Sequence, residues 1–386
     1  MADANRRLRL GMVGGGEGAF IGAVHRIAAR LDDHYELVAG AFSSDSARGN
    51  RSAQALHVAP DRSYADFEVM ARAEAARDDG IDVVAIVTPN HLHVPIAEAF
   101  LNAGIHVICD KPLTTDLALA KDLGALVKKT GLFFGLTHNY TGYPLIRQAR
   151  EMVQSGVLGQ IRLTQMEYVQ QWLTEDLENY DNKQAVWRTD PKQSGPAGCV
   201  GDIGTHVYNM MRFITQLEVD EISADLTVFV PGRRLDDNAH MMLRYKGGAR
   251  GALWSSQVAP GNENGLSIRI YGTKGGIAWS QEHPTILRHS PLNAPPRILT
   301  PGGPELGPSA LAASRIPAGH PEGYLEGFAQ LYSDFAGLIR AHMAGDATAE
   351  ESRLAPGIED GIDGVRFISR AVESSTKNAA WVKFAD

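Results

Sequence analysis

The junction between the first apolar run and a glycine-rich turn restricts the possible folds of this chain more than any other feature. An apolar run over residues 8–13 leads directly into GGGEGAFIG at positions 14–22, and a helical pattern follows. Glycines at such a turn let the backbone approach a pyrophosphate, while the start of the helix supplies amide donors and a favourable dipole. A glycine pattern alone is a weak signal, but this position after a first strand predicts a dinucleotide-binding turn.

Gly14 and Gly16 supply the first two glycines of the G-x-G-x-x-G pattern, and the third is open to two interpretations. Counted from Gly14, the third glycine is replaced by Ala19, a residue that the pattern tolerates. Alternatively, the loop is longer and ends at Gly22.

Short apolar runs alternate with helical stretches over the first third of the chain. This alternation predicts a parallel sheet covered on both faces by helices, that is, a doubly wound, Rossmann-like α/β domain over residues 1–138. The apolar runs cover residues 8–13, 36–42, 83–88, 106–109 and 133–137, and the helical stretches cover 23–31, 46–56, 94–103 and 114–129.

The alternation of apolar runs and helical stretches ends near residue 140. Residues 139–386 are predicted to form an α+β domain with an open, mainly antiparallel sheet, which would serve substrate binding and oligomerisation. Strand-length runs separated by glycine-containing turns indicate this sheet. Residues 283–320 are rich in Pro, Gly, Ala and Ser and are expected to form an ordered loop or arm. The two C-terminal helices, near residues 325–344 and 357–374, could pack back on the first domain. The strand-length runs are 160–170, 222–230, 239–245, 249–257, 267–271 and 276–279.

Composition excludes several classes of protein. The net charge of −8 and the lack of a Lys/Arg block argue against a nucleic-acid-binding protein. The two cysteines, Cys109 and Cys199, form neither a disulfide framework nor a metal site, so no metal is expected. A polar start and the absence of a long apolar run predict a cytoplasmic protein without a signal peptide or membrane span.

The cofactor's ribose is expected to meet the end of the second strand. An acidic residue is usual there in NAD-binding domains, but this chain has Ser43 and Ser44, followed by Asp45. The two hydroxyls and the nearby Arg48 could accept the 2′-phosphate of NADP, whereas Asp45 would repel it. NAD is therefore the expected cofactor, with NADP as the alternative.

Five motifs resemble those of the glucose–fructose oxidoreductase / inositol dehydrogenase / MocA family over essentially the whole chain. Two positions depart from the family pattern: Asp110 replaces a more usual Glu, and Asn209 stands where Asp often follows the histidine. The last two motifs are similar to the branch that acts on inositols, glucose-type sugars, anhydrosugars and glycosides, and so is the segment over residues 320–324. The motifs are Thr88-Pro89-Asn90-His91-Leu92-His93, Cys109-Asp110-Lys111-Pro112, His138-Asn139-Tyr140, Trp187-Arg188-Thr189-Asp190-Pro191 and Gly201-Asp202-Ile203-Gly204-Thr205-His206.

The resemblance implies hydride transfer between nicotinamide and a secondary hydroxyl of a sugar, glycoside or inositol. Such an oxidation needs a base for the hydroxyl proton, and histidine suits this role because its pKa lies near neutrality. His206 is the candidate base. Asp202, four residues earlier on the same helix face, can orient the substrate or the histidine. Lys111, at the sheet edge where ligands of open α/β folds bind, can stabilise the developing alkoxide.

Further residues are assigned to binding by their position or by the resemblance. Trp187 and Arg188 can offer a stacking face and a hydrogen-bonding fork to substrate hydroxyls. The other predicted substrate contacts are Tyr140, Asp202, His206, His320 and Tyr324. The predicted cofactor contacts are Gly14, Gly16, Gly22, Ser43, Ser44, Thr88, Pro89, Asn90, His93, Asp110, Lys111 and Asn139.

Two other functions fit the same motifs. Some relatives are glycoside hydrolases that use NAD to oxidise a sugar transiently, eliminate the aglycone, add water and return the hydride. A non-catalytic dinucleotide-binding regulator is the third hypothesis, although such a protein need not retain Lys111, Asp202 and His206 together. The open sheet of the second domain predicts a homo-dimer or homo-tetramer.

Overall fold

The structure, a computed structural model, describes residues 6–180, 182–346 and 354–385. It divides into two compact units, each built from two segments of the chain. The first unit comprises Met1–Gly142 and Tyr324–Ile362, and the second comprises Tyr143–Gly323 and Asp363–Asp386.

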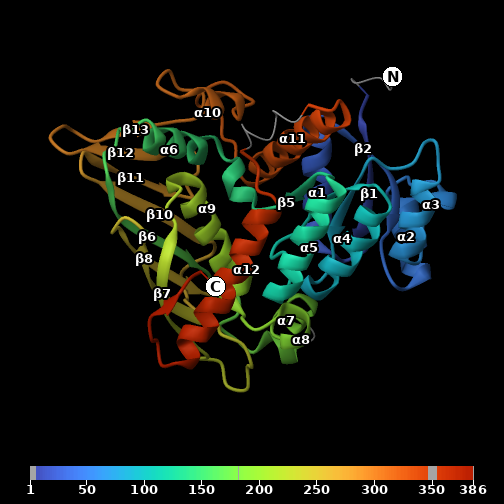
Figure 1. The fold of residues 1–386 in the computed structure, drawn as a ribbon, viewed down its shortest axis with the longest axis horizontal. Helices are drawn as coiled ribbons and strands as arrows, with labels where there is room; N and C mark the ends of the chain where they lie inside the picture. The colour runs from blue at the N-terminus through green and yellow to red at the C-terminus, as the bar shows by residue number, and fades with distance from the viewer. Residues whose placement is uncertain (1–5, 181, 347–353, 386) are drawn as a thin grey trace. The chain divides into compact units, whose positions relative to one another are not determined.

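The first unit is organised around a parallel sheet (Figure 1). Within its described residues, five strands lie in the order β2-β1-β3-β4-β5, and every neighbouring pair is parallel. The predicted Rossmann-like α/β fold is confirmed. The strands are β1 (Leu8–Gly14), β2 (Tyr35–Ala41), β3 (Val83–Val87), β4 (His106–Cys109) and β5 (Phe134–Leu136), and the helices are α1 (Phe20–Leu31), α2 (Ser46–Ala55), α3 (Phe67–Ala75), α4 (His93–Asn102) and α5 (Leu117–Thr130).

Sequence and burial agree at the centre of this sheet. All five residues of β3, Val-Val-Ala-Ile-Val, are buried, as expected for a parallel strand covered on both faces. The helix α11 (Tyr324–Met343) also belongs to this unit and adds Phe328 and Phe335 to the core that contains β1. The Tyr35 hydroxyl donates a hydrogen bond to the main-chain carbonyl of Tyr332 at 2.9 Å, which joins β2 to α11.

The second unit contains a larger, mainly antiparallel sheet (Figure 1). Within the described residues, nine strands lie in the order β13-β12-β11-β10-β6-β9-β8-β7-β14, and only β6 and β9 pair in parallel. The predicted open, mainly antiparallel sheet is confirmed. The strands are β6 (Ile161–Val169), β7 (Val219–Thr227), β8 (Asn238–Tyr245), β9 (Arg250–Ser256), β10 (Gly265–Gly272), β11 (Gly275–Ser280), β12 (Leu287–Pro291), β13 (Arg297–Leu299) and β14 (Val382–Lys383).

Helices cover one face of this sheet. Along β8, Ala239, Met241 and Leu243 are buried while His240 and Met242 are exposed, so one face is packed and the other is open. The second unit also contains α6 (Pro144–Gln154), α7 (Lys183–Arg188), α8 (Pro191–Ser194), α9 (Thr205–Thr215), α10 (Pro308–Ala312) and most of α12 (Ile358–Thr376).

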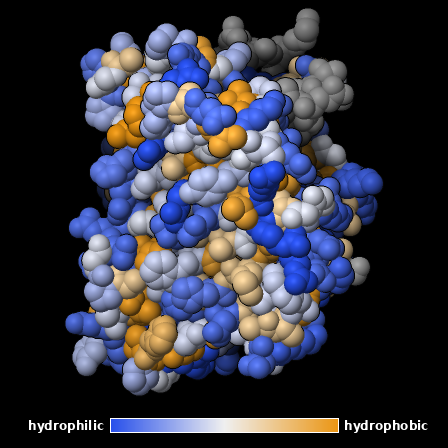
Figure 2. Space-filling model, turned by 90° about the vertical axis from the view of Figure 1, so that its left-hand side faces the viewer, coloured by the Kyte–Doolittle hydropathy of each residue, from blue (hydrophilic) through white to orange (hydrophobic). Residues whose placement is uncertain are grey.

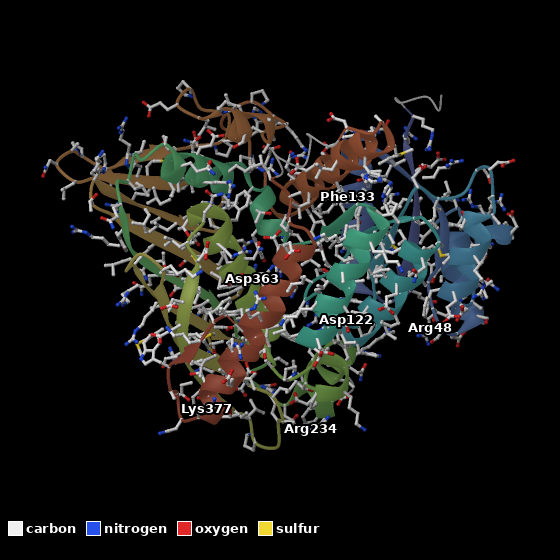
Figure 3. All side chains as sticks on the ribbon, in the orientation of Figure 1. Arg48, Asp122, Phe133, Arg234, Asp363 and Lys377 are labelled. Carbon is white, nitrogen blue, oxygen red and sulfur yellow. The ribbon has the colours of Figure 1, made fainter. Side chains whose placement is uncertain are left out.

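Tyr208 joins α9 to α12. Its ring stacks on Phe367 with a centroid separation of 4.3 Å, and its hydroxyl donates to the carboxylate of Asp363 at 2.6 Å. Asp363, labelled in Figure 3, also forms an ion pair with Arg212 of α9 at 3.0 Å. These contacts hold α9, the helix that contains the candidate catalytic residue His206 as its second residue.

Several elements differ from the sequence prediction. The segment over residues 283–320, expected as a loop or arm, contains β12, β13 and α10. Both strands pair at the edge of the larger sheet, and this pairing, rather than their local composition, makes them strands. No helix was predicted at α3, α7 or α8. These are short helices, whose weak apolar periodicity gives little signal.

A buried ion pair provides a test of the first unit's stability. Glu74 of α3 is 1% exposed, and its carboxylate accepts from the Arg62 guanidinium, the Tyr64 hydroxyl and the Ile81 amide. Because Glu74→Ala leaves the buried Arg62 charge without this partner, we expect the free energy of unfolding in urea to fall by about 3–5 kcal/mol. The control is Glu68→Ala on the same helix, whose pair with Arg72 is exposed, with an expected loss below about 1 kcal/mol. Equal losses for both variants would contradict the prediction.

Candidate active site

The glycine-rich turn brings two backbone segments into closer contact than any side chain allows. Gly14 and Gly15 have positive φ angles of 83° and 69°. A Cβ atom on Gly22 would lie 2.3 Å from the Cα of Gly15, and one on Gly16 would lie 2.7 Å from the carbonyl oxygen of Phe42. Gly22 therefore makes the close helix–strand approach of the third glycine, and the longer of the two loop interpretations describes this chain.

The end of β2 carries the residues predicted to meet the ribose. Asp45 caps the start of α2: its carboxylate accepts from the Arg48 amide at 2.9 Å, and this hydrogen bond lowers the pKa of Asp45. The Ser43 hydroxyl accepts from the Asp45 amide at 3.1 Å. Arg48, labelled in Figure 3, lies in the first turn of α2. The structure thus places Ser43 and Ser44 immediately before a helix that begins with a carboxylate.

His93 ties together the two loops that follow β3 and β4. Its Nδ1 lies 2.8 Å from the Pro112 carbonyl oxygen, and its Nε2 lies 2.9 Å from the Thr88 carbonyl oxygen. The ring is 1% exposed, and burial lowers the pKa of His93. The neutral ring carries one N–H group, so it donates to one of these carbonyls and packs against the other, between the Thr88-Pro89-Asn90 loop and the Lys111-Pro112 loop.

The carboxylate of Asp110 links the ends of β4 and β5. Its Oδ1 accepts from the Lys111 amide at 2.9 Å and from the Thr137 hydroxyl at 2.8 Å. His138 follows Thr137 and is also buried; burial and the nearby Lys111 charge lower the pKa of His138 to about 3. The structure therefore brings Asp110 and Lys111 together with the start of the third motif.

Two further predicted residues of the first unit, Asn139 and Tyr140, lie in a buried 3-10 turn (Asn139–Gly142). The Tyr140 ring lies 6.3 Å from the Tyr324 ring at the start of α11, so the first unit brings these two predicted substrate contacts together. His320 belongs to the second unit, where it is exposed and its Nδ1 lies 3.0 Å from the Pro317 carbonyl oxygen.

In the second unit, Asp202 and His206 lie on consecutive turns of one helical segment. Asp202 belongs to a π-helical turn (Val200–Gly204), and His206 is the second residue of α9. Two side chains hold the Oδ2 atom of Asp202: the Gln257 amide donates at 2.8 Å and the Arg188 Nε donates at 3.3 Å. The helical segment thus runs directly from Asp202 to His206, and Gln257 and Arg188 are among the groups that hold the carboxylate.

Arg188 is held on several sides. Its guanidinium carbon lies 4.2 Å from the ring centre of Trp187 and 5.9 Å from that of Trp172, and Nη1 donates to the Gln184 side chain at 2.6 Å. The structure therefore brings the predicted residues Trp187, Arg188 and Asp202 together. Cation–π stacking and the ion pair both restrict the guanidinium.

Amide and aromatic side chains extend this cluster along the ends of β6 and β10. The Tyr168 hydroxyl and the Gln170 amide each donate to Asn264 at 2.8 Å, and the Tyr168 ring lies 6.2 Å from His206. Gln257 was not predicted from the sequence. It follows β9 in the Ser-Ser-Gln-Val sequence and is 2% exposed, and only the fold reveals that it contacts Asp202. Carboxylate, amide and aromatic groups in one cluster suit a ligand with several hydroxyls.

A second carboxylate anchors the start of this helical segment. Asp236, 7% exposed, accepts from the main-chain amides of Gly198 at 2.6 Å and Val200 at 3.0 Å, and from the Cys199 thiol at 3.1 Å. Burial raises the pKa of the Cys199 thiol well above its usual value, so it is not a nucleophile. Asp236 thereby fixes the chain that presents Asp202.

Comparisons with known proteins decide the family. The family model described as "Oxidoreductase family, NAD-binding Rossmann fold" matches residues 8–138. The model described as "GFO/IDH/MocA C-terminal domain" matches residues 146–278. The chain is 36% identical over 383 residues to the uncharacterised oxidoreductase YfiI of Bacillus subtilis (strain 168), and the alignment covers 98% of each chain. The chain belongs to the GFO/IDH/MocA oxidoreductase family.

Solved structures of this family agree with the assignment. An oxidoreductase from Sinorhizobium meliloti is 52% identical, with a TM-score of 0.89 and coverage of 98% of this chain and all of the other. An inositol dehydrogenase homologue from Azotobacter vinelandii, complexed with NADH and myo-inositol, is 36% identical, with a TM-score of 0.93 and coverage of 98% of each chain. The family resemblance, the oxidoreductase class and the NAD-binding domain predicted from the sequence are confirmed.

The described residues contain neither a metal site nor a membrane-spanning helix. No group of three or more His, Cys, Asp or Glu side chains is arranged to hold a metal ion in that part of the GFO/IDH/MocA chain. None of its described helices combines the length and the apolar character that crossing a membrane requires.

The close approach of Gly22 to Gly15 predicts a loss of nucleotide binding on substitution. We expect Gly22→Ala to weaken NADH binding by roughly tenfold or more, because the added Cβ displaces the loop that faces the pyrophosphate. Fluorescence titration with NADH measures the effect. The control is Gly337→Ala on α11, where a Cβ meets no atom within 4 Å. Unchanged affinity of a folded Gly22→Ala variant would refute the longer loop.

Proposed function

We propose that this chain is an NAD-dependent dehydrogenase of sugars or cyclitols, which transfers hydride between a secondary hydroxyl and nicotinamide. The observation that carries the proposal is the Asp202 carboxylate, held by Gln257 and Arg188 one helical turn before His206. A fixed acceptor beside a histidine suits a substrate that offers several hydroxyls. The myo-inositol complex of the Azotobacter vinelandii homologue supports the same substrate class.

His206 is proposed as the base that removes the hydroxyl proton. It is half-buried at the start of α9, and Tyr168 lies on one side of it. Asp202, with its charge fixed in place, orients the substrate hydroxyls or the imidazole. The gain from a positioned general base is typically about 10²–10⁴-fold in rate.

Lys111 is proposed to hydrogen-bond the reacting oxygen and to stabilise the alkoxide charge that develops as the proton leaves. Its main-chain amide is fixed by Asp110, and the following residue, Pro112, is tied to His93. An ammonium group placed before the reaction begins stabilises this charge without further rearrangement.

The residues of the first unit fit a nicotinamide dinucleotide. Gly14, Gly16 and Gly22 allow the tight turn proposed to face the pyrophosphate, since a Cβ at Gly16 or Gly22 would meet main-chain atoms within 3 Å. When bound, NAD supplies the acceptor for the hydride. NAD is favoured over NADP because the Asp45 carboxylate would repel a 2′-phosphate. The other proposed cofactor contacts are Ser43, Ser44, Thr88, Pro89, Asn90, His93, Asp110, Lys111 and Asn139, and the proposed substrate contacts are Tyr140, Trp187, Arg188, Asp202, His206, His320 and Tyr324.

The first assay follows the absorbance of reduced nicotinamide. The protein is incubated with NAD or NADP and a panel of inositols, hexoses, anhydrosugars and aryl glycosides, while the products are analysed in parallel. Reduced cofactor formed in step with substrate loss supports the dehydrogenase. Release of the aglycone without accumulated reduced cofactor, but dependent on NAD, identifies the glycoside hydrolase instead. Binding of NAD without turnover of any compound identifies the non-catalytic regulator.

Two substitutions test the catalytic roles. We expect His206→Ala and Lys111→Ala each to lower kcat by roughly 10²–10³-fold, because each removes a group that acts on the reacting oxygen. NADH binding is expected to persist in both variants. The controls are His283→Ala and Lys129→Ala, which alter exposed residues of the same types in the same units. Turnover near that of the unaltered protein in both test variants would refute this mechanism.

We also propose that the open face of the larger sheet packs against a second copy of the chain. Leu163 on β6 and Tyr271 on β10 are paired across the strands and are 52% and 41% exposed. Met242 on β8 is 54% exposed, and Phe229, just after β7, is 63% exposed. Figure 2 shows apolar patches lying among strongly polar side chains on one side of the molecule. Exposed apolar groups gathered on one face are typical of an interface.

Charged substitutions on this face test the oligomer. We expect the unaltered protein to be a dimer or tetramer by size-exclusion chromatography with light scattering. The double variant Leu163→Glu/Tyr271→Glu is expected to be smaller, because it places two carboxylates in an apolar contact. The control is Leu119→Glu on α5, where the leucine is 46% exposed in the first unit. An unchanged assembly in the double variant would refute this interface.

A further inference from the structure

A buried histidine of α1 lies behind the loop that carries Lys111. His25 is fully buried in the first unit, and its Nδ1 lies 2.8 Å from the hydroxyl of Tyr332 on α11. Its Nε2 lies 4.0 Å from Oδ1 of Asp110 and has no hydrogen-bond partner among the described residues. This ring therefore stands between α11 and the carboxylate that precedes the lysine.

The surroundings define the protonation state of this ring. Burial lowers the pKa of His25 to about 4, so the imidazole is neutral at neutral pH and carries one N–H group. Burial also raises the pKa of the Tyr332 hydroxyl, which therefore keeps its proton. If the hydroxyl donates to Nδ1, the N–H group is on Nε2 and faces the Asp110 carboxylate. The opposite tautomer would direct a lone pair at that carboxylate, which is unfavourable in a buried site.

Asp110 accepts hydrogen bonds from two segments of the chain at the same oxygen atom. Oδ1 accepts from the Lys111 amide at 2.9 Å and from the Thr137 hydroxyl at 2.8 Å, and it is the oxygen that His25 faces. The His25 ring is itself held edge-on by Phe328, with a centroid separation of 4.8 Å. His25 therefore faces the same oxygen atom that accepts from the main chain of Lys111.

We infer that His25 is a positioning residue for Lys111, acting through Asp110. The Nε2–H dipole of His25 directs the Asp110 carboxylate so that Oδ1 accepts the Lys111 amide, and the Tyr332 hydroxyl fixes the tautomer that makes this possible. At 4.0 Å the contact is a charge–dipole attraction rather than a hydrogen bond. The effect on turnover rests on the proposed role of Lys111, whereas the tautomer is a property of the fold alone.

The first experiment measures the tautomer directly. Nitrogen-15 NMR of the full-length protein gives the imidazole shifts, and the His25 signal is assigned by its loss in His25→Gln. We expect the Nε2–H tautomer throughout pH 6–8, with no titration. A dominant Nδ1–H tautomer or a protonated ring in that range would overturn the inference. This result does not depend on turnover, so a protein inactive toward every substrate would refute the proposed function and leave the inference to be judged by NMR.

The second experiment separates positioning from general stability. We expect His25→Leu to lower kcat about tenfold or more, while KM and NADH affinity stay within about twofold, because misplaced reacting groups slow the chemical step. His25→Gln, which keeps a donor and an acceptor, is expected to recover most of the rate. The control is His106→Leu, which removes another buried histidine of the first unit, one that accepts from the Phe133 amide. A fall in kcat no larger than that of the control at matched thermal stability would overturn the inference.

A milder variant tests the same inference if His25→Leu does not fold. Tyr332→Phe removes only the hydroxyl that is proposed to fix the tautomer. We expect a mixture of tautomers in the NMR spectrum and a fall in kcat of about threefold to tenfold, because Lys111 is then less well positioned. An unchanged tautomer together with unchanged kcat would contradict the proposed role of Tyr332 and His25.

Discussion

The parallel order of the five strands in the first unit is the constraint on which its candidate site depends. Because these strands all run in one direction, the segments that follow β1, β3, β4 and β5 meet at one edge of the sheet. His93 lies between two of these segments, with its ring nitrogens 2.8 Å from the Pro112 carbonyl and 2.9 Å from the Thr88 carbonyl, and its one N–H group donates to one of them. The sheet thus brings distant motifs together, and one buried ring packs between two of them.

Buried or half-buried carboxylates hold the candidate residues in place within each unit. Asp110 accepts from a main-chain amide and a hydroxyl, Asp236 accepts from two amides and a thiol, and Asp202 accepts from Gln257 and Arg188. Several donors at one carboxylate offset the loss of its hydration and hold its orientation. Asp110 directly precedes Lys111, and Asp202 lies one turn before His206. In each unit, a carboxylate is therefore fixed close in sequence to the residue proposed to act on substrate.

The sequence predicts those parts of the structure that depend on local pattern. Strand–helix alternation predicts the Rossmann-like sheet, and the order of five motifs predicts the family. The sequence leaves two interpretations of the glycine-rich turn, because either Ala19 or Gly22 can take the third glycine position of the pattern. The structure decides for Gly22, since only a steric contact with Gly15 distinguishes them. Likewise β12 and β13 have weak local signals and become strands by pairing at the sheet edge.

Contacts between distant residues are the part that the sequence does not reveal. His25 and Tyr332 are 307 residues apart, and Gln257 lies 55 residues from Asp202, so no spacing rule relates them. Arg188 illustrates the same limit at shorter range. Its motif predicts a substrate contact, and in the structure its guanidinium already binds Asp202 and Gln184 and stacks on Trp187. An arginine held in this way keeps a charged carboxylate stationary, so the contribution proposed for it in substrate binding can be made through Asp202 as well as by direct contact.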